Sequence, residues 1–280
     1  MKFAYYPGCS LHGTAKEYDL SLRAVCRALD IDLEEVPDWN CCGASSAHSL
    51  DNKLAISLCA RNLKIIEQQN LDVVIPCAAC FSRAKISSHT LKNNTALRSK
   101  IENEMGFNFK LQTKIYHLIE LIVNEVGLDK VRAHIKRYLT DLRLVCYYGC
   151  LLVRPHDITE LDDKEDPQLL DILMSATGAA AIDWPYKTEC CGASLSLSKS
   201  EVVVELVGRM VSWAKEAGAQ AIVTACPLCQ ANLEMRQQGR GKIPIFYFTE
   251  LLGLAFGLKE AEGCLKKHIV NTDKLVKSLI

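Results

Sequence analysis

The chain has 280 residues, and its 33 Lys and Arg residues balance its 33 Asp and Glu residues to a formal net charge of zero. This balance argues against nucleic acid or an anionic membrane surface as a partner. The length allows one large domain or two small ones. The longest apolar stretch, 244–258, is interrupted by Glu250 and is shorter than the roughly 20 residues of a membrane helix. Since the N-terminus also shows no leader, we expect a soluble cytoplasmic protein without membrane insertion.

Short β-like runs alternate with longer helical patterns along the chain, which predicts parallel strands joined by crossover helices. The segment 159–167, rich in Asp and Glu, is expected to be an exposed loop. In chain order the expected elements are a strand at 2–6, helices at 15–29 and 52–69, strands at 73–76 and 143–148, a helix at 168–177 and a strand at 221–224.

Fourteen cysteines are a large number for a chain in a reducing compartment and indicate metal or redox chemistry. Ten of them form two sets in the same order, spaced C-x31-CC-x34-C-x2-C and C-x39-CC-x34-C-x2-C. The motif Cys-Cys-Gly-Ala-Ser occurs at 41–45 and again at 190–194. An internal duplication explains this repeat. We therefore expect an α/β fold of two pseudo-symmetric Rossmann-like halves with parallel sheets, 1–140 and 141–280, each binding one cluster.

The cysteine spacing restricts the kind of metal site. A Cys-x-x-Cys pair alone fits a metal centre, a zinc knuckle or a thioredoxin-like redox pair. Adjacent cysteines suit two metal atoms of one polynuclear cluster, because neighbouring side chains in extended backbone point apart. Each half offers five cysteines, whereas a cubane cluster or a tetrahedral zinc takes four. Either one cysteine per half is structural, or the cluster is not a cubane.

This pattern resembles the cysteine-rich CCG domain, and two copies in one chain resemble the catalytic B subunit of heterodisulfide reductase. The resemblance implies two noncubane [4Fe-4S] clusters that reduce a small-molecule disulfide to two thiols in one-electron steps. The implied ligands are Cys9, Cys41, Cys42, Cys77 and Cys80 for one cluster, and Cys150, Cys190, Cys191, Cys226 and Cys229 for the other.

The resemblance also implies partners from the heterodisulfide reductase complex, in an electron-bifurcating assembly. These are the A subunit, with flavin and iron–sulfur groups, and the C subunit, with iron–sulfur groups. The chain has no Gly-rich nucleotide signature, so no flavin or nucleotide is expected in it. One alternative is an electron-transfer component of a larger oxidoreductase, such as an aromatic-acyl-CoA reductase complex. A second is a structural zinc site at the two Cys-x-x-Cys pairs.

Several other residues are weighed beside the ten cysteines. His12 and His48 lie near the first motif and are candidate proton donors. Cysteines without a counterpart in the other half are expected to pack as small apolar side chains, although Cys146 lies close enough to Cys150 to compete as a ligand. Basic residues that flank the cysteine loops either bind an anionic substrate tail or solvate the surface: Arg83, Lys85, Lys187, Arg236, Arg240 and Lys242.

Overall fold

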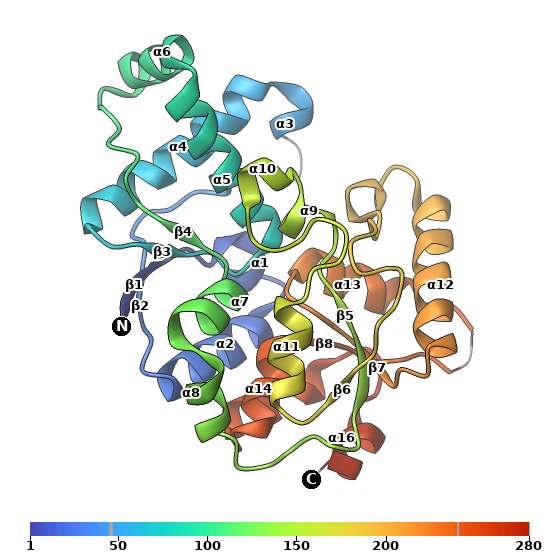
Figure 1. The fold of residues 1–280 in the computed structure, drawn as a ribbon. Coiled ribbons are helices and arrows are strands. Elements are labelled where there is room, and N and C mark those ends of the chain that lie inside the picture. Colours follow the sequence, from blue (N-terminus) through green and yellow to red (C-terminus); the bar gives the residue numbers. More distant parts are fainter. Residues whose placement is uncertain (45–46, 240, 280) are drawn as a thin grey trace.

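The computed structural model describes residues 1–44, 47–239 and 241–279 as an α/β protein with two similar halves (Figure 1). Each half contains a four-stranded parallel sheet, ordered β2-β1-β3-β4 in the first half and β6-β5-β7-β8 in the second. The strand order is the same when each half is read in sequence. The predicted α/β fold with two Rossmann-like halves is therefore confirmed.

The first half contains short strands, helices on both sides of the sheet and one π-helical turn. Its elements are β1 (Lys2–Tyr5), α1 (Gly8–His12), α2 (Lys16–Ala28), β2 (Asp32–Glu35), α3 (Ala47–Leu50), α4 (Asn52–Gln69), β3 (Val73–Val74), α5 (Ala78–Asn93), α6 (Thr95–Met105), β4 (Ile115–Tyr116), α7 (Leu118–Glu120), the π-helical turn η1 (Leu121–Val126) and α8 (Leu128–Ala133).

The second half repeats the strand–helix alternation and ends in additional short helices. Its elements are β5 (Arg143–Tyr147), α9 (Cys150–Val153), α10 (His156–Thr159), α11 (Leu169–Ala176), β6 (Ala180–Ala181), the 3-10 turn η2 (Ala193–Leu195), α12 (Ser200–Glu216), β7 (Ala221–Thr224), α13 (Pro227–Arg236), β8 (Ile245–Tyr247), α14 (Phe248–Ala255), α15 (Lys259–Cys264), the 3-10 turn η3 (Leu265–Lys267) and α16 (Asp273–Leu279).

Local sequence signals set the ends of the long helices. The Asp51 side chain accepts a hydrogen bond from the Leu54 N–H at 2.7 Å and begins α4, which ends before Asn70 in a left-handed conformation. This helix spans the predicted residues. By contrast β2 was not predicted, because its Asp-Leu-Glu-Glu sequence lies at a sheet edge with alternating exposure and lacks an apolar run. Within the described residues, no helix has both the length and the apolar character to cross a membrane.

The two halves share one hydrophobic core rather than having separate ones. Helix α2 of the first half packs against α14 and α15 of the second, and α5 packs against α9 and α10. Ser21 Oγ and Thr249 Oγ1 form a buried hydrogen bond of 2.7 Å across this interface. In Figure 1, α2 and α14 lie side by side at the bottom of the molecule. The division into domains at residues 140 and 141 stays a prediction.

Candidate metal centre

The patterned cysteines lie at the carboxyl ends of the parallel strands. Cys9 lies in α1 just after β1, and Cys150 begins α9 just after β5. Cys77 and Cys226 occupy the residues directly before α5 and α13, each after a central strand. Loops at the carboxyl ends of parallel strands converge at one edge of the sheet, where binding sites form. The duplicated motifs therefore place their thiols at corresponding edges of the two sheets.

Within each half, the thiols lie close together in pairs. The Sγ atoms of Cys42 and Cys80 are 3.3 Å apart, and those of Cys9 and Cys41 are 3.9 Å apart. Adjacent Cys41 and Cys42 thus each lie beside a different cysteine from elsewhere in the motif.

The second half repeats this pairing. The Sγ atoms of Cys191 and Cys229 are 3.6 Å apart. A hydrogen bond between the Cys150 and Cys190 thiols raises the pKa of Cys150 and lowers that of Cys190 to about 6.

Exposure follows the same pattern in both halves. The first cysteine of each motif and the first of each adjacent pair are open to solvent, with Cys150 only partly so. The other three cysteines of each half are buried: Cys42, Cys77 and Cys80 in the first half, and Cys191, Cys226 and Cys229 in the second. Each group thus has a buried base and a side that faces solvent.

The thiols share protons instead of ionising independently. Hydrogen bonds from Cys41 and then Cys80 lower the pKa of Cys42 to about 3, whereas the hydrogen bond to Cys42 raises the pKa of Cys41. Like charges at such distances disfavour one another, so one thiol of a pair keeps the proton. A bound cation removes this conflict and deprotonates the whole group.

The two cysteine groups meet in the middle of the molecule. A hydrogen bond between the thiols of Cys77 in the first half and Cys226 in the second raises the pKa of Cys77. The pKa of Cys226 is lowered, first by Cys229 and then by Cys77. Both residues are buried. The innermost thiols of the two halves are thus direct neighbours, which the sequence alone did not reveal.

Backbone atoms and glycines complete each group in the same way. The Gly43 N–H donates to Cys41 Sγ at 3.5 Å, and the Gly192 N–H donates to Cys190 Sγ at 3.4 Å. Gly43 and Gly192 have φ of +75° and +77°, a conformation that glycine adopts without strain. The glycine that follows each adjacent pair thus turns the chain so that an amide points at a sulfur.

The donor set fits a multinuclear iron–sulfur group. Two thiolates bound to one tetrahedral metal at about 2.3 Å lie roughly 3.8 Å apart, and the paired sulfurs are separated by comparable distances. Soft thiolate ligands favour iron–sulfur clusters, zinc or cuprous copper. Among the described residues, no three or more His, Cys, Asp or Glu side chains have the geometry of a single-ion site. Five thiols per half are more than one tetrahedral ion accepts.

The histidines predicted as proton donors lie on the solvent side. His12 Nε2 is 2.9 Å from Glu35 Oε1, and its ring packs edge-on against Trp39. His48 in α3 is exposed. Among the described residues, no hydrogen bond joins either ring to a thiol. Arg240, weighed as an anion-binding residue, lies outside the described residues.

The four cysteines without a counterpart are buried. Burial raises the pKa of Cys26, Cys59 and Cys264 to about 12 each, and burial followed by the charge of Asp171 raises that of Cys146. Cys59 Sγ also lies 3.4 Å from the Cys42 carbonyl oxygen, which places it beside the first group.

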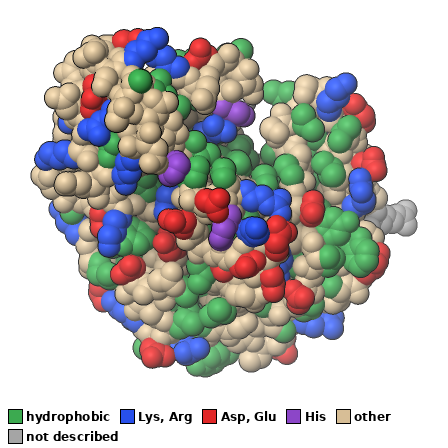
Figure 2. Space-filling view, turned by 45° about the horizontal axis from the view of Figure 1, so that its top comes forward, with side chains coloured by type: hydrophobic (Ala, Val, Ile, Leu, Met, Phe, Trp, Pro, Cys, Tyr) green, Lys and Arg blue, Asp and Glu red, His purple; other side chains and the backbone are tan. Residues whose placement is uncertain are grey.

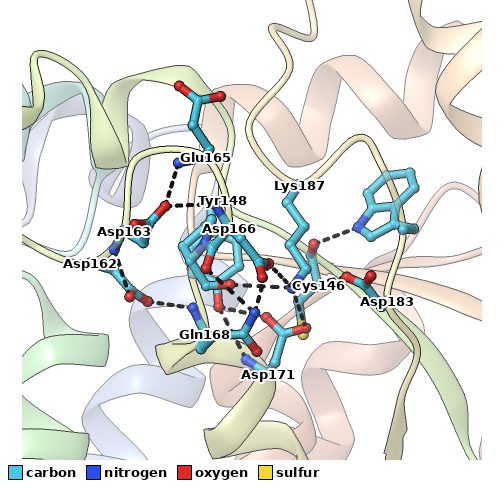
Figure 3. Close-up of polar contacts among 12 residues, drawn as sticks. Cys146, Tyr148, Asp162, Asp163, Glu165, Asp166, Gln168, Asp171, Asp183 and Lys187 are labelled. Carbon is cyan, nitrogen blue, oxygen red and sulfur yellow. Dashed lines mark hydrogen bonds and ion pairs between the residues drawn. The ribbon is translucent and has the colours of Figure 1, made fainter.

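Lys187 is buried, and Figure 3 shows its side chain among acidic residues. Its side chain is 4% exposed, and its Nζ lies 2.8 Å from Asp166 Oδ1, 3.2 Å from Asp183 Oδ1 and 3.5 Å from Asp171 Oδ1. The Tyr148 hydroxyl donates to Asp171 Oδ2 at 2.6 Å. Lys187 is therefore committed to these carboxylates and does not serve as the anion-binding residue considered from the sequence.

This buried network positions the second cysteine group. The Lys187 carbonyl accepts hydrogen bonds from the Tyr148 and Gly149 N–H groups at 2.9 and 3.0 Å. Those residues precede Cys150, and Lys187 precedes Cys190 by three residues. The loop from Asp162 to Gln168 folds over the network in Figure 3. The acidic segment thus contributes Asp166 to the network, while residues 163–166 are exposed, as expected for this loop.

The surface is hollowed between the two halves. Figure 2 shows a depression between the upper-left part of the molecule, formed by first-half helices, and the right-hand part, with hydrophobic side chains inside it. A separate cavity of about 480 Å³ borders Cys190 and is lined by Tyr186, Met210 and Trp213. Glu189 and Arg209 also line it, so the wall beside Cys190 combines apolar and charged side chains.

Comparison with known families accounts for the duplicated motif. The model of the CCG family, described as a cysteine-rich domain, matches residues 3–83 and 144–234. The chain belongs to the CCG cysteine-rich domain family. All ten patterned cysteines fall inside the two matched CCG segments. The predicted membership is confirmed, and it makes the chain an iron–sulfur electron-transfer protein of the oxidoreductase class.

Relatives of this CCG protein align along nearly its whole length. It is 28% identical to the 8-methylmenaquinol:fumarate reductase membrane anchor subunit of Wolinella succinogenes, over 98% of this chain and 99% of that protein. It is 27% identical to the B subunit of the ferredoxin/F420H2-dependent CoB-CoM heterodisulfide reductase of Methanosarcina acetivorans, over 99% of this chain and 96% of that protein. The predicted resemblance to the B subunit of heterodisulfide reductase is thereby confirmed.

A solved structure shares the fold. A hypothetical protein from Helicobacter pylori superimposes with a TM-score of 0.74 at 9% identity, over 95% of this chain and 51% of that one. At this identity the likeness concerns the fold alone.

Proposed function

We propose that this chain is the disulfide-cleaving component of a multi-subunit reductase and carries two iron–sulfur clusters. The net reaction is R–S–S–R′ + 2 e⁻ + 2 H⁺ → R–SH + R′–SH. The observation that supports it most is that the two inner cysteine loops meet: the Tyr18 hydroxyl lies 3.1 and 3.3 Å from the carbonyl oxygens of the residues that precede Cys77 and Cys226. A cluster usually passes one electron at a time, whereas a disulfide takes two. Two neighbouring clusters match that requirement.

The residues proposed to hold the clusters are the ten paired thiols. Five thiols per half, buried at the base and open on one side, suit a noncubane [4Fe-4S] cluster that keeps a face toward substrate. The clusters supply the electrons when bound. The proposed sets are Cys9, Cys41, Cys42, Cys77 and Cys80, and Cys150, Cys190, Cys191, Cys226 and Cys229.

The chain itself binds the clusters, orients the disulfide and shields both from water. The three buried cysteines of each half anchor the site in the shared core, and the depression between the halves gives a disulfide access to it. The two protons enter from the solvent side, where His12 and His48 are proposed donors. Electrons arrive from partner proteins in the cytoplasm, proposed to be the heterodisulfide-reductase-like A subunit, with flavin and iron–sulfur groups, and the iron–sulfur C subunit.

Product stoichiometry tests this function. Anaerobic protein reduced by a viologen dye and mixed with a panel of low-molecular-weight disulfides, the CoB-CoM heterodisulfide included, should release two thiols for every two electrons consumed. The same disulfides should change the electron paramagnetic resonance spectra of both clusters together. No thiol and no spectral change with any disulfide, while the clusters are present, would reject the reductase function.

A second function is supported by the Wolinella relative, which is a subunit of 8-methylmenaquinol:fumarate reductase. In this alternative the chain relays electrons from its partners to or from a quinone-linked fumarate reductase and binds no disulfide. Its clusters would then respond to partner proteins but remain indifferent to every disulfide in the panel.

A further inference from the structure

Two buried hydrogen-bond donors lie where the inner cysteine loops of the two halves meet. The Tyr18 hydroxyl is 3.1 Å from the Pro76 carbonyl oxygen and 3.3 Å from the Ala225 carbonyl oxygen. These carbonyls belong to the residues directly before Cys77 and Cys226. One hydroxyl hydrogen thus faces two carbonyls, one from each half.

His117 supplies the second donor at this contact. Its Nε2 is 2.9 Å from the Pro76 carbonyl oxygen, and its Nδ1 accepts a hydrogen bond from the Ile119 N–H at 3.3 Å. Because Nδ1 is an acceptor, the ring hydrogen of the neutral imidazole resides on Nε2 and points at the carbonyl. Tyr18 and His117 are both fully buried. Two donors therefore serve two carbonyls, and both donors come from the first half.

The second half contributes a stacked ring to this arrangement instead of an equivalent donor. Tyr247 precedes α14 as His117 precedes α7, so the two residues occupy equivalent positions. The Tyr247 ring stacks on Tyr18 at a centroid distance of 4.3 Å and an interplanar angle of 1°. Its hydroxyl contacts Gln230 Oε1 at 3.4 Å instead of a loop carbonyl. The stack fixes the Tyr18 ring while its hydroxyl is directed at the loops.

We propose that Tyr18 and His117 are positioning residues that hold the two inner cysteine loops at a fixed separation and so set the interaction between the two clusters. This inference rests on the proposed two-cluster function. Removing either donor leaves one hydrogen to serve two buried carbonyls, and an unsatisfied buried carbonyl favours water entry or movement of its loop. Neither side chain touches substrate, so the effect passes through the loops of Cys77 and Cys226.

Tyr18→Phe and Tyr247→Phe form a matched pair for the test. Each removes one buried hydroxyl and keeps the stacked rings, but only Tyr18→Phe removes a donor to both halves. His117→Asn is an independent variant, because Asn still accepts the Ile119 N–H at the helix start while its short side chain does not reach Pro76. Each anaerobic holoprotein is analysed for iron, for the midpoint potentials of its clusters and for the magnetic interaction between the reduced clusters.

Tyr18→Phe and His117→Asn should retain wild-type iron but lose part of the magnetic splitting and alter the potentials, while Tyr247→Phe stays like wild type. Disulfide reduction per iron should fall roughly 10- to 100-fold, as for misplaced reacting groups. Unchanged splitting and potentials in both donor variants, or equal changes in Tyr247→Phe, would overturn the inference. Wild-type protein with interacting clusters but no disulfide cleavage would reject the proposed function alone, since the spectra require no disulfide.

Discussion

Tyr6 and Tyr147 make the same hydrogen bond in the two halves. The Tyr6 hydroxyl donates to the Asn40 carbonyl at 2.8 Å, and the Tyr147 hydroxyl donates to the Glu189 carbonyl at 2.7 Å. Each accepting residue directly precedes an adjacent cysteine pair. A tyrosine at the end of the first strand of each half thus fixes the turn that presents two of the thiols.

Replacing either tyrosine should weaken the cluster of its own half. Tyr6→Phe and Tyr147→Phe each lose one hydrogen bond, worth about 1 kcal/mol. We expect iron release to a chelator in two kinetic phases, one for each cluster. Each variant should accelerate one phase, and the two variants should accelerate different phases. Tyr138→Phe, at a tyrosine that is 59% exposed, is the control and should leave both phases unchanged. Identical acceleration of both phases by a single variant would contradict independent halves.

Glycines before the first cysteine of each motif leave room for the last one. Gly8 has φ of +73°, and a Cβ there would lie 2.9 Å from Cys80 Sγ; the corresponding distance from Gly149 to Cys229 Sγ is 3.3 Å. Gly8→Ala should cost about 1–2 kcal/mol for the backbone and also reduce iron content, with Gly149→Ala milder. Gly106→Ala, where φ is +73° but no atom lies within 4 Å, should lower stability without iron loss. Equal iron content in all three variants would refute this role of the glycines.

The buried Lys187 network should be a large contributor to stability. Lys187→Met leaves the nearly buried Asp171 without its cation. We therefore expect a loss of about 2–3 kcal/mol in the free energy of unfolding. This loss is smaller than for a fully buried ion pair, because Asp166 and Asp183 are exposed. Lys2→Met removes an exposed ion pair with Glu34 and should leave the free energy of unfolding almost unchanged. Anaerobic urea unfolding measures both. A Lys187 effect as small as that of Lys2 would contradict the assignment.

His268 forms ion pairs that join the C-terminal segment to α13, the helix that contains Cys229, and these ion pairs depend on pH. Its Nδ1 is 3.0 Å from Glu234 Oε1 in α13, and its Nε2 is 3.1 Å from Glu250 Oε2 in α14. Although burial lowers it, the Glu250 charge and the hydrogen bonds to both carboxylates raise the pKa of His268 to about 10.

A histidine whose folded pKa is raised stabilises the protein fully below its ordinary pKa near 6.5, and this contribution disappears as pH rises through about 10. The wild type should therefore lose stability, on the order of a few kcal/mol, between pH 7 and about 10.5. His268→Gln should lack this decline, and His134→Gln, at a partly exposed histidine, should keep it. Urea unfolding across this pH range measures the decline. If the free energy of unfolding fell equally with pH in wild type and His268→Gln, this role of His268 would be disproved.

Local sequence patterns predict much of the fold. Residues 52–69 and 221–224 were predicted with the bounds of α4 and β7, because a cap residue or a β-branched run marks each end. The duplicated spacing likewise selects the ten cysteines from fourteen.

The features that the sequence did not predict depend on contacts between segments that are distant along the chain. Lys187 looks like a surface residue until Asp166, Asp171 and Asp183 come together around it. His117 shows no metal spacing, and Tyr18 lies in an ordinary amphipathic helix, so their shared carbonyls appear only once the halves are packed. Sequence patterns record periodicity within an element and say little about which buried polar groups meet.

Metal analysis of anaerobically prepared protein tests the central claim most directly. Two four-iron clusters on the ten paired cysteines predict about eight irons and about eight acid-labile sulfides per chain, with little zinc. Cys191→Ala should reduce both values toward about four and leave the spectrum of the first cluster intact. Stoichiometric zinc with little iron in the wild type would contradict the account.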